Sequence, residues 1–470
     1  MLGQGSKWRA VYRVLAMSLV CAVSLIVSCF DLLAAETFFL APNRQIGDVA
    51  TIEVVMQVGG ELHLPNPADA ASLRKVPMSV AAKLVYDERL IALRKVDKGT
   101  SRAVRHYHSA KALVEIEKGE QKPTLESKFA RIAIDTTEDE TTLVSPNRAL
   151  TRESLDLIDV AANTLVLDEL LPAEPVVLGG VWKHSDHLLA ALLRLDAVSL
   201  GDAQSMLSEV NKQQNAATIS LAGTVHGAVG GVATEIELKA RYTFDLKLRR
   251  ITSIALLVKE KRSVGHVGPG LDVVAKQIVK IKPIDASEQL TDNAVATAQR
   301  ALDEAVKLLA FESPHNRFRL QHDRRWFVTT DEKKLTIFRL VDRGELVAQC
   351  KVAALDPVPA GQTFALADFQ RDIEKTLDKK FGQFVSAKEE TDSAGRRVYR
   401  VVATGNVAEL PILWLYYVFT TREGRRLSVA FTMEQGLVDR FGRADQQFLA
   451  DLEIAPPQTA ATSSPTPAKR

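Results

Sequence analysis

Polar and apolar residues alternate through the stretch Glu235-Ile-Glu-Leu-Lys-Ala-Arg-Tyr-Thr-Phe-Asp-Leu-Lys-Leu248. Successive side chains of a β-strand point to opposite faces, so this stretch predicts one long strand with a buried face and a solvated face. Residues 218–229 precede it across Gly230-Gly231, a pair typical of hairpin turns, and residues 251–261 follow a short polar corner. We therefore expect an antiparallel meander with one face in water.

The chain has 470 residues, more than one hydrophobic core usually serves, which predicts two domains. We expect an α+β protein whose first domain is β-rich, with an open barrel as an alternative form of that domain. The expected divisions are a signal peptide (1–35), the β-rich domain (36–284), a connecting helix (285–312), an α+β domain (313–454) and a disordered tail rich in Pro, Ser, Thr and Ala (455–470).

Helices are expected beside the meander. Thr151 can cap the start of a short helix, and Ser185 or Asp186 can cap another that carries Leu188, Leu189, Leu192 and Leu193. A further short helix is expected within residues 201–215. The clearest helical spacing runs over residues 288–309. Together, the helices between residues 185 and 215 could cover the apolar face of the meander.

The N-terminus has the layout of a secretory signal. Lys7, Arg9 and Arg13 precede an apolar run over residues 14–30, and small residues allow cleavage after Ala35. This layout predicts export to the periplasm or cell envelope. Two alternatives remain. Ile26-Val-Ser-Cys29 resembles the bacterial lipobox, which would make Cys29 a lipidation site, and the apolar run could stay uncleaved as an anchor.

The charge balance argues against a polyanionic partner. The whole chain carries a formal charge of +2, and Lys7, Arg9, Arg13 and Asp31 contribute +2 of it, so the mature chain has a formal charge of 0. A neutral chain has no global electrostatic reason to bind nucleic acid or an anionic membrane. We therefore expect no nucleic-acid partner, and membrane association only through lipidation or an uncleaved signal.

The order of elements in the second half is distinctive. Ser313-Pro314, Phe318-Arg-Leu320 and Trp326 precede a hairpin, a long helix, three strands and a terminal helix. This order resembles the PsbP-like fold, found in the extrinsic P protein of photosystem II and in small exported bacterial proteins. The resemblance implies a binding or assembly factor rather than an enzyme. The first domain loosely resembles open-barrel lipoprotein carriers of the LolA and LolB type. The whole chain is similar to secreted bacterial proteins in which long curved sheets precede a small α+β domain.

The apolar stripe Tyr242, Phe244 and Leu246 is the candidate ligand-binding surface. If helices cover it fully, the stripe is core. If cover is incomplete, a concave apolar sheet forms a groove for a lipid or a hydrophobic peptide. The main expectation is thus an exported, non-catalytic protein without a cofactor that binds an apolar ligand or another envelope protein.

A second hypothesis is a metal-dependent hydrolase. His184 and His187 would share a helix face, and Asp186 could orient one imidazole ring. Zinc catalysis needs a third ligand and an open position, and no third ligand stands nearby in the sequence. The competing interpretation is that Asp186 caps the helix while the histidines face solvent. A third hypothesis is a purely structural envelope component that binds no ligand.

Overall fold

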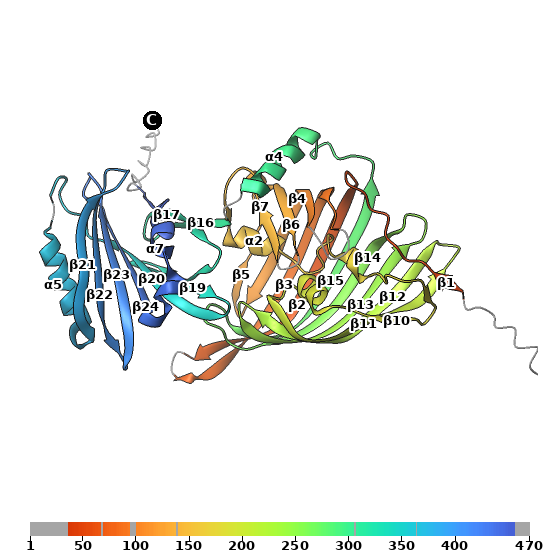
Figure 1. The fold of residues 1–470 in the computed structure, drawn as a ribbon, viewed down its shortest axis with the longest axis horizontal. Coiled ribbons are helices and arrows are strands. Elements are labelled where there is room, and N and C mark those ends of the chain that lie inside the picture. Colours follow the sequence, from red (N-terminus) through yellow and green to blue (C-terminus); the bar gives the residue numbers. More distant parts are fainter. Residues whose placement is uncertain are drawn as a thin grey trace, which may run out of the picture.

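The computed structural model describes residues 36–455 except 67–68, 95–99, 138–139, 305–306 and 363. The predicted signal peptide, Cys29 and nearly all of the predicted tail lie outside these residues. The described chain is an α+β protein dominated by antiparallel strands, as the sequence predicted. Figure 1 shows the two parts, a large curved sheet and a smaller sheet flanked by helices.

A twelve-stranded sheet forms the first part. Along the sheet the order is β10 (Val181–Lys183), β11 (Ala197–Asn211), β12 (Ala216–Val229), β13 (Val232–Asp245), β14 (Arg250–Arg262), β15 (Gly270–Ile284), β2 (Val49–Asn66), β3 (Asp69–Ala92), β4 (Ser101–Ile116), β6 (Arg131–Thr136) and β7 (Thr141–Val144), with β5 (Gly119–Gln121) beside β4. All these strand pairs are antiparallel. Within the described chain, β10 and β7 each pair on one side, so the sheet is open rather than a closed barrel.

The predicted meander is β12, β13 and β14. The turn residues Gly230 and Gly231 both have positive φ, as a two-residue hairpin requires. Along β13 the even-numbered residues are buried and the odd-numbered residues are mostly exposed, so the alternation follows the pleat. The buried face lines the concave side of the sheet and carries most of the main core of the molecule.

A segment between β8 (Leu150–Thr151) and β11 lies on this concave face, and we call residues 152–193 the inserted segment. It contains α2 (Arg152–Ile158), the short 3-10 helix η2 (Leu167–Leu170), β9 (Val176–Val177), which pairs with β1 (Thr37–Phe38), β10 and α3 (Asp186–Leu193). The predicted caps are present. The Oγ1 atom of Thr151 accepts from the Ser154 amide at 3.1 Å, and the Oγ atom of Ser185 accepts from the Leu188 amide at 3.2 Å.

Two of the expected helices differ in the structure. Residues 201–215 were expected to be helical but belong mainly to β11, because Ala203, Ser205 and Leu207 alternate inward and the strand pairs with β12. The helix expected over residues 288–309 is shorter. It is α4 (Asp292–Glu304), and Leu309 already belongs to β16 (Leu308–Ser313). Helix α4 packs on the outer face of the sheet against Val104 and Ala133.

The second part contains a seven-stranded antiparallel sheet. Its order is β18 (Trp326–Glu332), β19 (Leu335–Asp342), β20 (Glu345–Leu355), β24 (Arg426–Glu434), β23 (Leu410–Thr420), β22 (Arg397–Val407) and β21 (Phe381–Thr391). Helix α5 (Leu366–Leu377) covers one face beside Val401 and Trp414. The other face packs on β16, β17 (Phe318–Asp323), α6 (Val438–Phe441) and α7 (Ala444–Leu449) through a core that includes Trp326 and Phe448.

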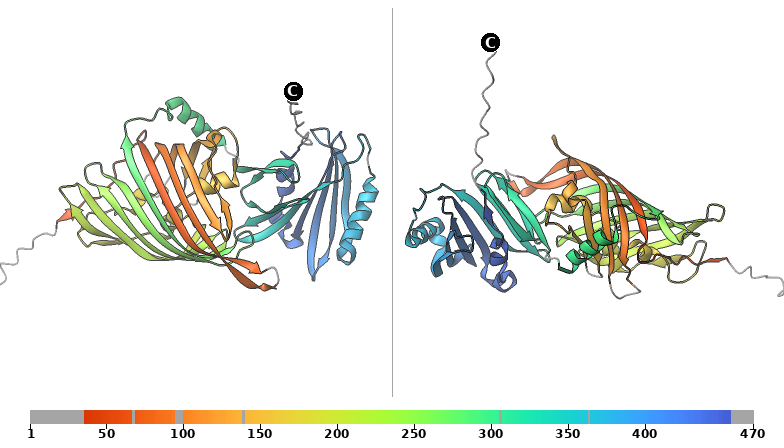
Figure 2. Two further views of the ribbon diagram at one scale, coloured as in Figure 1. Left: turned by 180° about the vertical axis from the view of Figure 1, so that it is seen from behind. Right: turned by 90° about the horizontal axis from the view of Figure 1, so that it is seen from above.

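The two parts are joined by packing and hydrogen bonds. Strand β16 pairs in parallel with β8 of the first part, and this pairing joins the two parts in one small sheet of order β25 (Glu453–Ile454), β17, β16 and β8. An Nη2 atom of Arg324 donates to the Leu143 carbonyl at 2.5 Å. Two hairpin turns also meet, since the backbone of Gly344 lies against the backbone of Gly231. Both views in Figure 2 show the parts in contact.

Candidate functional site

The concave face of the large sheet is the candidate functional site, and the inserted segment occupies it. This segment contributes many buried apolar side chains to the core, among them Leu155, Leu157, Ile158, Leu165, Val166, Leu167, Leu170, Leu188, Leu189, Leu192 and Leu193. From the sheet, the facing residues are likewise apolar, and they include Ile52, Leu84, Leu238 and Ile254. The concavity is therefore lined by apolar side chains on both sides.

Polar side chains hold the irregular part of the inserted segment, residues 159–171, by its backbone carbonyls. Two of them come from the sheet outside the segment, and one comes from β10, the sheet strand that the segment contributes. Gln277 of β15 donates from Nε2 to the Ala161 carbonyl at 2.6 Å. Tyr242 of β13 and Trp182 of β10 both donate to the Leu170 carbonyl at 2.9 Å. A buried carbonyl without a partner is costly, so these inward-facing polar side chains satisfy backbone that has no sheet partner of its own. We call these contacts the carbonyl anchors.

An ionic cluster ties the same segment to β3 and β4. Arg105 donates from Nε to Glu88 at 2.8 Å and from Nη2 to the Oδ1 atom of Asn163 at 2.7 Å. Thr164 donates to both carboxylate oxygens of Glu88, and its carbonyl accepts from Nη1 of Arg44 at 2.9 Å. The side chains of Arg105 and Glu88 are each 4% exposed, so this is a buried pair with its hydrogen bonds satisfied.

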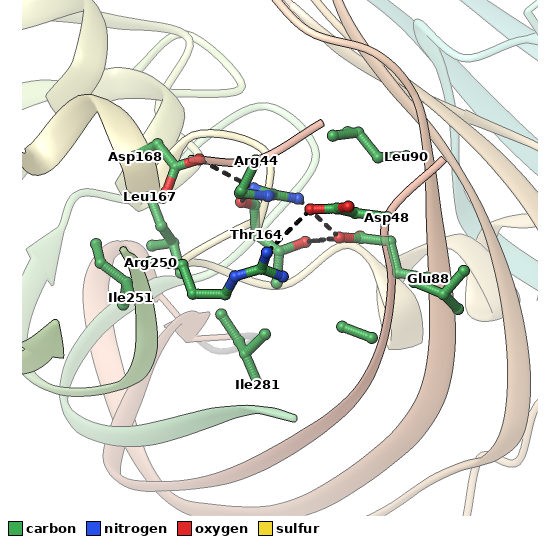
Figure 3. A pocket seen from close by; sticks show the side chains of 12 residues that line it. Arg44, Asp48, Glu88, Leu90, Thr164, Leu167, Asp168, Arg250, Ile251 and Ile281 are labelled. Atoms are coloured by element: carbon green, nitrogen blue, oxygen red, sulfur yellow. Dashed lines mark hydrogen bonds and ion pairs between the residues drawn. The ribbon is translucent and has the colours of Figure 1, made fainter. Parts of the chain in front are cut away.

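The cluster continues into a cleft between the inserted segment and the sheet (Figure 3). Arg44 also faces the carboxylate of Asp168 at 3.4 Å, and Arg250 pairs with Asp48 at 3.1 Å. Burial raises the pKa of Asp168, and the positive charge of Arg44 opposes this rise. The positive charges of three arginines thus balance the negative charges of three carboxylates, so the cleft has no excess charge to attract an ionic substrate. The residues are Arg44, Arg105 and Arg250 with Asp48, Glu88 and Asp168.

The size of this cleft limits its chemistry. Its space for solvent is about 20 Å³, which is room for about one water molecule. Ligand sites in proteins are usually several hundred Å³ in volume. The ion pairs around the cleft therefore hold the inserted segment in place, and the cleft has no room for an organic ligand in this arrangement.

The predicted ligand stripe lies under the inserted segment. Tyr242 and Phe244 are fully buried, and Leu246 is partly buried against the same core. The hydroxyl of Tyr242, which donates to the Leu170 carbonyl, also lies 2.9 Å from the Oγ atom of Ser205. In this conformation the stripe contacts protein, and a ligand could reach it only if the inserted segment moved.

The structure places the three residues of the predicted metal cluster in two different surroundings. His184 lies in the strand–helix connection, where its Nε2 atom is 2.7 Å from the Oγ atom of Ser205, and burial lowers its pKa to about 4. Asp186 and His187 instead line a hollow on α3. Among the described residues no group of three His, Cys, Asp or Glu side chains is arranged to hold a metal ion.

The hollow beside α3 has a volume of about 430 Å³ and lies at the seam between the two ends of the open sheet. One wall comes from the β6–β7 hairpin, with Thr137, Glu140 and Thr141. The other comes from α3 and the start of β11, with Asp186, His187, Arg194 and Ala197. We call it the seam hollow. It is large enough for part of an organic ligand, and it lies next to the inserted segment.

Sequence reasoning did not identify Glu88, Arg105 or Gln277 as important. The sequence did contain a sign of them, because each is a polar residue at a strand position where the alternation predicts an apolar one. Gln277 stands at an inward position between Ala275 and Val279, where an apolar residue is expected. A polar residue on the buried face of a strand needs a buried partner, and here the partner is a backbone carbonyl of the inserted segment.

No protein-family model and no curated protein matches this chain. Parts of it resemble solved structures. PsbP from the cyanobacterium Synechocystis sp. PCC 6803 is 13% identical over 32% of this chain and 95% of that chain, with a TM-score of 0.26. The Ran-binding protein Mog1p of Saccharomyces cerevisiae is 8% identical over 32% of this chain and 96% of that chain, also with a TM-score of 0.26.

A structure of lipovitellin, described by its lipid–protein interactions, is 9% identical over 53% of this chain and 27% of that chain, with a TM-score of 0.30. PsbP is the family that the second half of the chain was expected to resemble, and this match covers about a third of the chain. All three TM-scores are too low to bear on function.

Proposed function

We propose that this is an exported, non-catalytic protein of the cell envelope that binds an apolar ligand on the concave face of its large sheet. The observation that carries the proposal is the filling of that face. A leucine-rich segment of the chain, rather than a second sheet, covers an apolar surface that spans most of the strands. When the segment moves aside, Tyr242 and Phe244 become ligand contacts.

The way the irregular part of the inserted segment is held supports its movement as a unit. This part, residues 159–171, is attached through side chains of the sheet and through Arg44, and it belongs to no continuous strand pairing. Such attachments break locally without unfolding the sheet, because each is a hydrogen bond or ion pair rather than a ladder of backbone bonds. The seam hollow then offers the route by which an apolar ligand enters.

Export is the part of the proposal that rests on the sequence alone, through the basic residues, apolar run and cleavage site before residue 36. Within the described residues, no helix is long and apolar enough to cross a membrane.

Native mass spectrometry of the mature protein, isolated from its own envelope without chelators, tests the proposal. We expect a chain that begins after Ala35 and carries a noncovalent mass equal to a lipid. A chain of the processed mass with no bound lipid, even after incubation with total lipid extract, would contradict ligand binding. A bound divalent metal would instead favour the hydrolase hypothesis, and an acylated Cys29 would identify a lipoprotein.

A further inference from the structure

The outer face of the large sheet carries a hollow that the function proposed above does not use. Its volume is about 490 Å³, and it lies over the middle of β2 and β3 and the C-terminal part of β4. We call it the outer hollow. The side chains that face it from the strands and from the chain after β5 are Val55, Gln57, Ala81, Lys83, Lys111, Leu113, Lys122 and Thr124.

Strand register places these side chains in two adjacent rows on the outer face. Val55 pairs with Lys83 and Lys83 pairs with Lys111, which bridges to Thr124. In the next row Gln57 pairs with Ala81, and Ala81 pairs with Leu113. On the same strands, residues of the opposite parity, such as Val54 and Leu84, belong to the concave core, so the hollow opens away from the inserted segment.

The outer hollow has an excess of positive charge. Lys83 and Lys111 stand directly opposite each other on neighbouring strands, an arrangement that costs stability unless an anion lies between them. Lys83 pairs with Glu53 at 2.7 Å and Lys122 pairs with Glu120 at 2.6 Å, but these exposed pairs are weak. No ion pair involves Lys111 within the part of the chain that the structure describes.

Apolar surface continues from the hollow onto β15. Ile278 pairs with Val55, and their side chains are 44% and 36% exposed; Val274, two rows further along, is 41% exposed. On the same face of β15, Lys276 lies between Val274 and Ile278, and Lys280 lies beyond Ile278. Helix α4 covers the outer face at β4 and β6 and leaves this region open. Lysines around exposed apolar residues match a molecule with an anionic head and an apolar body.

We propose that the outer hollow binds the headgroup of an anionic phospholipid and docks this face of the sheet on a membrane surface. The proposal is independent of ligand binding on the concave face. It holds for a chain with no net charge because the charges are unevenly placed, and attraction to an anionic membrane is local, acting within a Debye length. The apolar residues and the size of the hollow favour a phospholipid over a free anion such as phosphate.

Sedimentation of the full mature chain with vesicles tests the proposal. We expect binding to vesicles of phosphatidylglycerol and phosphatidylcholine, much weaker binding to phosphatidylcholine alone, and loss of binding at high salt. Each lysine near an anionic surface contributes about a fivefold factor in affinity, so the Lys111→Gln/Lys122→Gln variant is expected to bind roughly 25-fold more weakly. A Val55→Ser variant, which keeps all charges, is expected to bind several-fold more weakly.

The matched control is Lys351→Gln/Lys375→Gln, which removes the same charge from exposed positions in the second part. It is expected to bind as the unmodified protein does. Equal binding to both kinds of vesicle, or an equal loss in the control, would overturn the proposal. So would isothermal titration in which inorganic phosphate binds at the lysines while the vesicles do not, since this outcome identifies a free-anion site.

Discussion

At the scale of single residues, the main feature is the number of charged and polar groups buried against the inserted segment. Arg105 has a 4% exposed side chain and contacts Glu88, Asn163 and Thr164, while its guanidinium also lies 4.8 Å from the ring centre of Tyr86. Removing one partner of a buried ion pair lowers stability far more than replacing both partners by apolar residues, because the remaining partner keeps an uncompensated charge.

Replacement of Arg105 by alanine should therefore destabilise the large sheet by about 3–5 kcal/mol, because Glu88 stays buried without its partner. Urea denaturation followed by hydrogen exchange in peptides of β3 and β4 measures the change. Arg241→Ala is the matched control, since Arg241 is exposed on the outer face of β13, and its effect should stay within about 0.5 kcal/mol. Equal effects of the two substitutions would show that the cluster contributes nothing.

His322 gives the second part of the molecule a pH dependence. It is 2% exposed and packs edge-on against Phe338, its Nδ1 atom lies 2.8 Å from the Asp323 carbonyl, and burial lowers its pKa to about 4. The imidazole is neutral in the folded state, whereas in the unfolded chain it binds a proton below a pH of about 6.5. The resulting stability is present above pH 6.5 and is lost as the pH falls towards 4.

We expect the second part to lose about 3 kcal/mol of stability between pH 7 and pH 4 through His322. A His322→Asn variant keeps an amide donor near the position of Nδ1 but does not titrate, so its unfolding free energy should depend less on pH over this range. His315→Gln, at an exposed position on the preceding turn, is the control and should keep the full slope. Parallel pH profiles for all three proteins would refute the assignment.

At the scale of elements, the inserted segment and the sheet are stabilised by different interactions. The strands have continuous antiparallel pairing, whereas residues 159–171 depend on the carbonyl anchors and the ionic cluster. Elements with few backbone ladders open at lower free energy than those around them. The inserted segment is thus the part of the first domain whose local opening is most easily shifted by one side chain.

A Gln277→Leu substitution should loosen the inserted segment while it leaves the sheet intact. It leaves the Ala161 carbonyl without its partner, which costs about 1–3 kcal/mol. Amide exchange over residues 159–166 should become faster, and lipid uptake should rise if the segment competes with ligand. Gln57→Leu on the outer face of β2 is the control for exchange. Unchanged protection of residues 159–166 would mean that this anchor does not limit opening.

At the scale of the whole molecule, the relation between the two parts depends on contacts from distant regions of the sequence. Gly344 has a φ of +81°, and a Cβ atom there would lie 2.6 Å from the Cα of Gly231. Gly361 has a φ of +80°, and a Cβ atom there meets nothing within 4 Å. The two glycines thus share a backbone conformation and differ in their surroundings.

The Gly344→Ala variant is expected to separate the two hairpin turns, whereas Gly361→Ala should not. Each substitution costs about 1 kcal/mol because alanine must adopt a left-handed backbone conformation, and only Gly344→Ala adds a clash between the two parts. Small-angle scattering should show a larger radius of gyration for Gly344→Ala, and proteolysis within residues 285–308 should be faster. The same radius and cleavage rate for both variants would mean that the turns do not hold the parts together.

Local pattern determined much of this architecture. The alternation through residues 235–248, the Gly230-Gly231 turn and the caps at Thr151 and Ser185 are set by side-chain direction, backbone freedom and short hydrogen bonds within a few residues. These features appear in the structure as predicted. The error at β11 had a local cause, because small and polar residues at Gly201–Ser205 resemble a helix start, and pairing with β12 overrides that tendency.

Only the tertiary structure decided what the apolar faces meet. The sequence predicted that Tyr242 and Phe244 share an apolar face of one strand, but it left open whether helices or an apolar ligand would cover that face. Contacts such as Arg105 with Asn163, Gln277 with Ala161, and Gly231 with Gly344 join residues far apart in the chain. Burial and charge neutralisation are properties of assembled surfaces rather than of local sequence, so the filled concave face and the lysine-rimmed outer hollow became visible only in the folded molecule.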